Sequence, residues 1–252
     1  MNQVEKANHF ISLHVAGTPL VLYNIWDAGG ARAIADSGAA AVATGSWAVA
    51  AAHGYEDGEK IPLAFILQIT QRIAESVSLP LSIDFEGGYS SNPDIVAENV
   101  RQLIRAGAIG INFEDQVLGG QGLYSIPDQT GRISAIRNTA EQENIPLFIN
   151  SRTDLFLKAK AAEHDALVDE AIDRATAYAE AGASGFFVPG LTQPSLIESI
   201  CQNTTLPVNV MMKGELTRIG DVAALGVSRV SFGPGPYVSA MTSMAEKFKA
   251  LT

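Results

Sequence analysis

The feature that most constrains the fold is a regular alternation of short apolar runs and helical stretches along nearly the whole chain. The apolar runs are continuous, as is typical of strands that are buried on both faces. Several joints between a helical stretch and the next strand contain a glycine between small or apolar residues, at Gly38, Gly107, Gly182 and Gly226. Glycine readily ends a helix, so these joints predict a repeated helix-to-strand turn.

The expected strands are 20–24, 40–44, 79–83, 110–114, 146–150, 185–188, 206–211 and 228–232. The expected helices are 28–37, 62–76, 93–105, 133–143, 166–181, 194–202, 215–225 and 236–251. Strands that alternate with helices form a parallel sheet. Because this chain has 252 residues, its eight strand–helix units match the size of a closed (β/α)8 barrel. We therefore predict the α/β class, with residues 1–252 as a single TIM-type barrel domain.

An open, doubly wound sheet is the alternative architecture. That fold commonly carries a G-x-G-x-x-G motif after its first strand, and the motif is absent after residues 20–24. No composition shift or low-complexity linker divides the chain, which favours one domain.

The charge and the termini limit the possible partners and compartment. The formal net charge is -10 and no basic run occurs, which argues against nucleic acid or an anionic membrane as a partner. The single cysteine, Cys201, excludes an intramolecular disulfide. The polar N-terminus is unlike a secretory signal, and the longest apolar stretch, 39–52, is too short and broken to span a bilayer. We expect a soluble cytoplasmic protein.

Polar residues follow the predicted strands at the end where a barrel carries its active site. They are Trp26 and Asp27; Thr44, Gly45 and Ser46; Asp84 and Glu86; Asn112 and Glu114; Asn150 and Arg152; and Asn209. On three neighbouring strands the residues are spaced i, i+2. Strand side chains alternate in direction, so such pairs point to the same side.

These residue types suggest a metal and a carboxylate ligand. Asp84, Glu86 and Glu114 could bind Mg²⁺ directly or through its waters, and Arg152 presents a fork that suits a substrate carboxylate. Gly45 and Ser46 could add backbone N–H groups. Simpler interpretations also exist: the acids could form a solvated loop, Arg152 could only pair with Glu114, and the asparagines could only satisfy backbone groups.

At these residues the chain resembles the isocitrate lyase/phosphoenolpyruvate mutase superfamily, from about residue 20 to 190. The matching segments are Asn24-Ile25-Trp26-Asp27 with Ala31-Arg32, Thr44-Gly45-Ser46, Gly54-Tyr55-Glu56-Asp57, Asp84-Phe85-Glu86-Gly87-Gly88-Tyr89, Asn112-Phe113-Glu114-Asp115-Gln116 and Ser151-Arg152. The resemblance implies a β/α barrel that binds Mg²⁺, with Mn²⁺ as a substitute, and an oxo acid or its enolate.

The resemblance also implies roles for individual residues. Asp57, Asp84, Glu86 and Glu114 match the metal-site positions, with Asp84 as the main direct ligand. Thr44, Gly45, Ser46 and Arg152 match the positions that hold the oxo acid, and we add Trp47 and Asn209 as substrate-binding residues. We expect Arg152, Asp57 and Glu114 to take part in catalysis, with Mg²⁺ and Arg152 stabilising an enolate.

Two departures from the family pattern narrow the activity. The K-[KR]-C-G-H loop of isocitrate and methylisocitrate lyases is replaced by 115–122, which contains no cysteine. The histidine that phosphonate-handling members carry at the end of strand six is replaced by Phe187-Val188-Pro189-Gly190. We still expect 117–124 to act as a lid, and the last helix, 236–251, could be exchanged between subunits of a homodimer or homotetramer.

The sequence is compatible with three functions. The first is a Mg²⁺-dependent lyase that forms a pyruvate-like enolate from a small 2-oxo or 2-hydroxy di- or tricarboxylate, decarboxylation of oxaloacetate included. The second is a P–C bond enzyme, either a mutase or a phosphonopyruvate hydrolase. The third is a catalytically silent barrel that binds an oxo acid.

Overall fold

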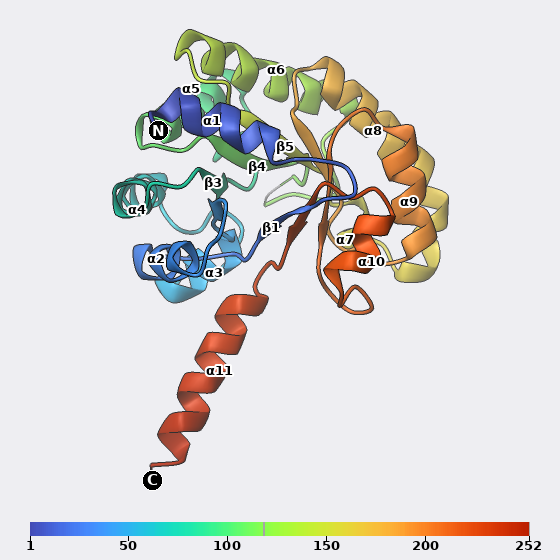
Figure 1. The fold of residues 1–252 in the computed structure, drawn as a ribbon. Coiled ribbons are helices and arrows are strands. Elements are labelled where there is room, and N and C mark those ends of the chain that lie inside the picture. Colours follow the sequence, from blue (N-terminus) through green and yellow to red (C-terminus); the bar gives the residue numbers. More distant parts are fainter. Residues whose placement is uncertain (118, 252) are drawn as a thin grey trace.

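Eight parallel strands surround a common axis in the computed structural model, which describes residues 1–117 and 119–251 (Figure 1). They are β1 (Leu20–Leu22), β2 (Val42–Ala43), β3 (Leu81–Asp84), β4 (Gly110–Glu114), β5 (Phe148–Arg152), β6 (Gly185–Phe187), β7 (Val208–Met211) and β8 (Arg229–Ser231). The strand order is β1-β8-β7-β6-β5-β4-β3-β2. The backbone N–H of Ile25 donates to Ala43 O at 2.9 Å and that of Gly45 donates to Ile25 O at 3.2 Å, so β1 also meets β2. The predicted (β/α)8 barrel is confirmed.

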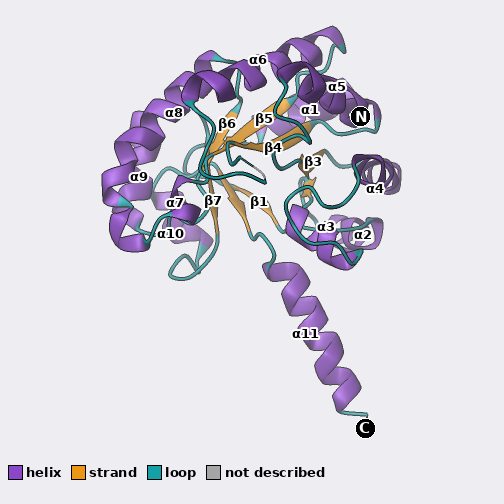
Figure 2. Cartoon of the chain, turned by 180° about the vertical axis from the view of Figure 1, so that it is seen from behind, coloured by secondary structure: helices purple, strands orange, loops and turns teal. Residues whose placement is uncertain are grey.

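Helices surround the strands on the outside (Figure 2). They are α1 (Gln3–Ser12), α2 (Ala28–Asp36), α3 (Ser46–Ala52), α4 (Leu63–Ser76), α5 (Pro93–Arg105), α6 (Ile126–Gln142), α7 (Leu155–Lys158), α8 (Val168–Glu180), α9 (Pro194–Asn203), α10 (Ile219–Ala224) and α11 (Gly235–Lys249). Two 3₁₀ turns, Ala161–Glu163 and Asp165–Leu167, lead into α8. The short α3 and α7 both follow strand ends and therefore lie beside the site.

The observed helices differ from the predicted ones in several places. The short α3 and α7 were not predicted, and α10 begins at Ile219 rather than at 215. Helix α6 begins at Ile126 rather than at 133, because the Ser125 side chain accepts the N–H of Asp128 at 3.2 Å and caps it. Helix α1 was not predicted, although Asn2 and Glu5 form a capping box. Its Phe10 packs edge-on against Phe148 at the amino end of β5, so α1 covers the barrel end opposite the site.

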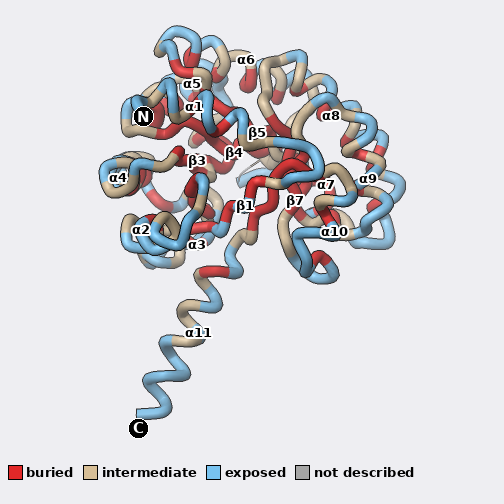
Figure 3. The backbone as a smooth tube through the Cα atoms, in the orientation of Figure 1, coloured by how far each residue is buried: buried red, intermediate tan, exposed pale blue. Residues whose placement is uncertain are grey.

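Helix α11 extends away from the barrel and is largely exposed (Figures 1 and 3). Its apolar residues Val238, Met244 and Phe248 are 47–67% exposed. A groove of about 570 Å³ lies on the barrel surface near β1, and its lining includes Val21 and Tyr23. No helix among the described residues is long and apolar enough to cross a membrane.

The barrel interior contains a buried cation beneath the site. Arg229 of β8 is 1% exposed and donates from Nη2 to Asn112 Oδ1 at 3.0 Å. Burial lowers the pKa of Arg229 to about 9, although the nearby Asp84 raises it. Asn150 also donates to Asn112 Oδ1, at 2.9 Å. The side-chain amide of Asn112 is therefore fixed from below by two donors.

Candidate active site

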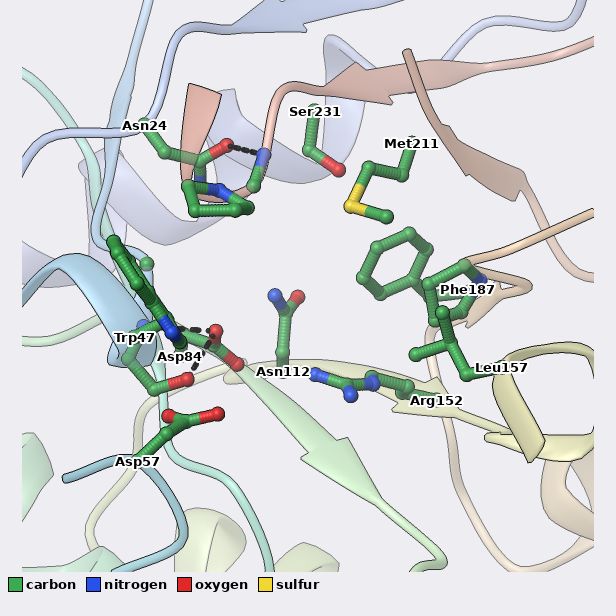
Figure 4. A pocket seen from close by; sticks show the side chains of 15 residues that line it. Asn24, Trp47, Asp57, Asp84, Asn112, Arg152, Leu157, Phe187, Met211 and Ser231 are labelled. Carbon is green, nitrogen blue, oxygen red and sulfur yellow. Dashed lines mark hydrogen bonds between the residues drawn. The ribbon is translucent and has the colours of Figure 1, made fainter. Parts of the chain in front are cut away.

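A cavity of about 170 Å³ opens at the carboxyl ends of the strands (Figure 4). Most of the residues that the sequence assigns to the site reach its wall: Gly45, Ser46, Trp47, Asp57, Asp84 and Arg152. They come from β3, β5, α3 with its N-cap Gly45, and the loop after α3. The strand ends thus bring residues that are far apart in the sequence to one place.

Asp84 is fixed by the end of β2 and the start of α3. Its Oδ2 accepts the backbone N–H of Ser46 at 3.0 Å and the hydroxyl at 2.9 Å, while its own N–H donates to Thr44 Oγ1 at 3.0 Å. Thr44 therefore lies behind Asp84 rather than on the cavity wall. Asp84 Oδ1 is buried without a hydrogen-bond partner. An unpartnered carboxylate oxygen is a suitable ligand atom for a hard cation.

The backbone N–H groups predicted to hold the substrate carboxylate already have partners. Gly45 donates to Ile25 O at 3.2 Å, and Ser46 donates to Asp84. Arg152 is accordingly the stronger candidate for this contact, and Ser46 would have to turn from Asp84 toward the substrate.

Glu86 connects the end of β3 to the loop that carries Asp57. Its Oε2 accepts the N–H groups of Gly58 and Glu59, both at 2.9 Å. Its φ of 49° lies in the left-handed region, a conformation that is costly for a residue with a side chain and is concentrated at functional sites. Burial, and then the charges of Asp57 and Asp84, raise the pKa of Glu86 to about 8.

A second hollow of about 170 Å³ adjoins the first and is acidic. Asp57, Glu86 and Glu114 line it together with Arg152. Burial and then Asp84 raise the pKa of Asp57, and burial raises the pKa of Glu114 well above its ordinary value. Three of the four acids predicted for the metal site thus line this hollow and Asp84 lines the adjoining cavity, and a divalent cation would relieve their mutual repulsion.

The donor set fits an ion that is held partly through water. Among the described residues no three Asp, Glu, His or Cys side chains come close enough to bind one ion directly. Mg²⁺ usually keeps several waters and takes one or two carboxylates. Direct binding by Asp84, with the other acids reached through water, stays the prediction from the sequence.

Arg152 lies between three acids. Its Nη1 is 3.0 Å from Glu114 Oε2, and it donates from Nε and Nη2 to Asp154 at 2.6 and 3.0 Å. Burial alone would lower the pKa of Arg152, but Glu114, Asp154 and Asp84 raise it above its ordinary value. The expected pair with Glu114 exists, and Arg152 nevertheless lines the cavity as a permanent cation.

Asp154 is a site residue that the sequence analysis missed. It is 1% exposed, and its N–H donates to Asp115 Oδ1 at 3.0 Å. Asp115 Oδ2 in turn accepts from Arg174 at 3.1 Å and from the Tyr178 hydroxyl at 2.9 Å. A chain of buried contacts therefore runs from α8 to Arg152. The i, i+2 spacing from Arg152 is the signal that could have identified Asp154.

The asparagines occupy different levels of the barrel. Asn112 lines the cavity, and because Oδ1 accepts two donors, its Nδ2 is the group that can donate to a bound molecule. Asn209 is fully buried, and its Oδ1 lies 3.4 Å from the Ser231 hydroxyl. It therefore lies below the residues that line the cavity. Asn24, which the resemblance includes, accepts the N–H groups of Phe232 and Gly233 at 2.8 and 3.0 Å and so connects β8 to β1.

The predicted lid, 117–124, includes Leu118, which lies outside the described residues. Next to it, Val117 donates to Gly122 O at 3.2 Å and Tyr124 donates to Asp115 O at 2.7 Å. The Tyr124 ring lies 4.2 Å from the guanidinium carbon of the buried Arg132. The base of the segment is therefore anchored to the site, and its closing motion stays a prediction.

Comparison with known proteins supports this interpretation of the fold. The family model for phosphoenolpyruvate phosphomutase matches residues 10–252. A crystal structure from Burkholderia cenocepacia J2315, provisionally described as a phosphonomutase, is 45% identical, covers 100% of both chains and has a TM-score of 0.97.

Curated relatives agree with this match. An uncharacterized protein of Mycobacterium tuberculosis H37Rv is 33% identical over 96% of this chain and 88% of its own length. An oxaloacetate decarboxylase of Bradyrhizobium sp. is 29% identical over 82% of this chain and 71% of its own length. The chain therefore belongs to the phosphoenolpyruvate phosphomutase family, within the superfamily that also contains the isocitrate lyases.

Proposed function

We propose that this protein is a Mg²⁺-dependent lyase that cleaves a small 2-oxo or 2-hydroxy carboxylate through a pyruvate-like enolate, by C–C cleavage or decarboxylation. One observation carries the proposal: the unpartnered Oδ1 of Asp84 and the guanidinium of Arg152 line one cavity beside a group of buried acids. Relatives named oxaloacetate decarboxylase and 2-methylisocitrate lyase support it. A structural neighbour, a phosphonopyruvate hydrolase, was solved in complex with oxalate and Mg²⁺.

Each residue has a role in this proposal. Asp84 holds the ion directly, and Asp57, Glu86 and Glu114 hold its waters. When bound, the ion supplies a positive charge that stabilises the enolate oxygen. Arg152 binds the substrate carboxylate and is aligned by Asp154. The N–H of Asn112 donates to the substrate from the cavity floor.

A thermal-shift experiment with Mg²⁺ and oxalate, an enolate mimic, tests the metal–enolate site. Because ligands that bind only the folded state raise its stability, we expect the two together to raise Tm by more than either alone. Absence of a joint shift would refute the site. A joint shift without pyruvate release from any 2-oxo acid would favour the silent barrel.

A P–C bond enzyme is the second candidate, because the 45% identical structure is provisionally described as a phosphonomutase. Phosphonopyruvate and oxaloacetate should therefore be assayed side by side. Turnover of phosphonopyruvate, with carboxylate substrates inert, would replace the lyase proposal. The apolar end of β6, Phe187 to Pro189, lacks a polar partner for a phosphonate.

We also infer a homo-oligomer in which α11 leaves its own barrel and packs on a second copy. The exposed apolar residues of α11 and the open groove beside β1 support this inference. Light scattering of the whole chain and of a form ending at Pro234 tests it. We expect a dimer or tetramer for the whole chain and a monomer for the shortened form. The same number of subunits in both would contradict the exchange.

A further inference from the structure

The two sides of the active-site cavity differ in chemistry. Asp57, Asp84 and Ser46 form one side, and the ends of β6, β7 and β8 with α7 form the other (Figure 4). The second side consists of Leu157, Phe187, Pro189 and Met211, joined by the hydroxyl of Ser231. We call these five residues the apolar wall. None of them carries a charge.

The cavity offers no free positive charge for a second anionic group. Among its described lining residues the one cation is Arg152, which already contacts Glu114 and Asp154 and is assigned to the substrate carboxylate. A carboxylate or phosphonate placed against the apolar wall would lose its water without gaining a partner, which is strongly unfavourable. The acids on the opposite side would repel it further.

Neutral polar groups lie where the two sides meet. The Ser231 hydroxyl makes only long contacts of 3.4 Å, to Asn209 Oδ1 and Val210 O. Asn112 lies at the floor with Oδ1 committed to Arg229 and Asn150. One hydroxyl and one amide N–H are suited to a neutral oxygen, such as an alcohol or an aldehyde.

We propose, on the basis of the lyase function above, that the apolar wall binds an uncharged, apolar leaving group. The substrate class is then a 4-hydroxy-2-oxo acid with a hydrocarbon substituent on C4. This monocarboxylate replaces the di- or tricarboxylate substrate that was expected from the sequence.

The corresponding reaction is a retro-aldol cleavage that needs no further reactant. The C4 hydroxyl proton passes to the Asp57 carboxylate, and the C4 oxygen becomes an aldehyde carbonyl. The C3–C4 bond breaks, and its electron pair forms the enolate of pyruvate. The same proton, returned to C3, gives pyruvate, and the apolar aldehyde leaves along the wall.

A matched pair of substrates tests the proposal. With Mg²⁺ present, pyruvate release is measured from 4-hydroxy-2-oxohexanoate, which has an ethyl group on C4, and from 4-hydroxy-2-oxoglutarate, which has a carboxylate there. We expect kcat/KM to be at least about 100-fold higher for the ethyl compound, since an unpaired buried charge is strongly disfavoured. A preference for the carboxylate compound, for oxaloacetate or for phosphonopyruvate would overturn the proposal but keep the enolate site.

Failure to cleave either hydroxy acid would also overturn it. The joint effect of Mg²⁺ and oxalate on Tm then decides separately whether the metal–enolate site survives. The proposal and the function on which it rests can therefore fail independently.

A variant with an added positive charge tests whether the apolar wall discriminates between the two substrates. Leu157 is 40% exposed, so Leu157→Arg introduces a cation without disturbing the core. We expect it to shift the ratio of kcat/KM values at least about 10-fold toward 4-hydroxy-2-oxoglutarate. The apolar control Leu157→Met should retain the preference of the natural chain for the ethyl compound. The same ratio in both variants would show that the wall does not contact the leaving group.

Discussion

The polar and apolar sides of one cavity are built in opposite ways. On the polar side almost every functional atom is held by a second residue: Ser46 holds Asp84, and Asp154 holds Arg152. On the apolar side Phe187 and Met211 contribute shape without hydrogen bonds. The contrast suggests that the polar side performs chemistry common to the family, whereas the apolar side selects the substrate of this chain.

Removing Arg152 from the polar side should have the largest effect on activity. We expect Arg152→Ala to lower kcat/KM about 1000-fold, because it removes the charge that holds the oxo acid and stabilises the enolate. Steady-state kinetics and circular dichroism measure activity and folding. Near-normal kcat/KM in this variant would contradict the assigned role, and Arg152→Lys serves as the control that keeps the charge but loses the fork.

Weakening the contacts that align Arg152 should have an intermediate effect on activity. Asp154→Asn weakens the fork that aligns Arg152, and loss of such supporting contacts typically costs about 10–100-fold in affinity or activity. We expect a raised KM with a smaller change in kcat, measured with saturating Mg²⁺. An unchanged KM would mean that Glu114 alone positions Arg152.

A change on the apolar side should be smaller and selective. Met211→Ala opens space beside Gly233 and Ser231, and we expect it to reduce kcat/KM for the ethyl substrate about 10-fold. The rise in Tm caused by Mg²⁺ and oxalate should persist, since the proposal places both ligands at the polar side. Loss of that rise would show that the two sides are not separable.

The smallest expected effect is a dependence of stability on pH. The pKa of Glu86 is raised to about 8 in the folded chain, so the folded state keeps this proton longer than the unfolded state does. Its contribution is complete below the ordinary carboxyl pKa of about 4.5 and is lost as the pH rises through about 8.

Without metal, Tm should therefore fall over this pH range, by roughly 2–4 °C for each kcal/mol lost. Melting curves of the natural chain and of Glu86→Gln check it. The variant should have the flatter profile, and identical slopes would exclude Glu86 as the titrating group.

The barrel was predictable because its strands are buried on both faces and its helix ends contain glycines. The start of α6 was not, since Pro127 and Gly131 interrupt the helical pattern although Ser125 caps the helix. The sequence placed Asp84 and Arg152 at one cavity because i, i+2 parity is fixed by the strand geometry.

Depth within the barrel was harder to predict. Parity puts Asn209 and Met211 on the same side of β7, but it does not tell which of them reaches the cavity. That depends on strand register, which pairs Asn209 with Arg229 and Met211 with Ser231. The apolar wall was predicted only in part. Phe187 and Pro189 were noted as replacing a histidine of the phosphonate-handling members, whereas Met211 looks like an ordinary core residue until the barrel closes opposite Asp84.

The contacts of Glu86 with Gly58 and Glu59 have a consequence for the order of binding. The same carboxylate faces the acid cluster and fastens the loop that delivers Asp57. An ion that kept Glu86 ionised would also keep this loop in place, and the pocket would then be complete before the organic molecule enters. Initial-rate kinetics would then follow a compulsory sequence, with metal first and substrate second.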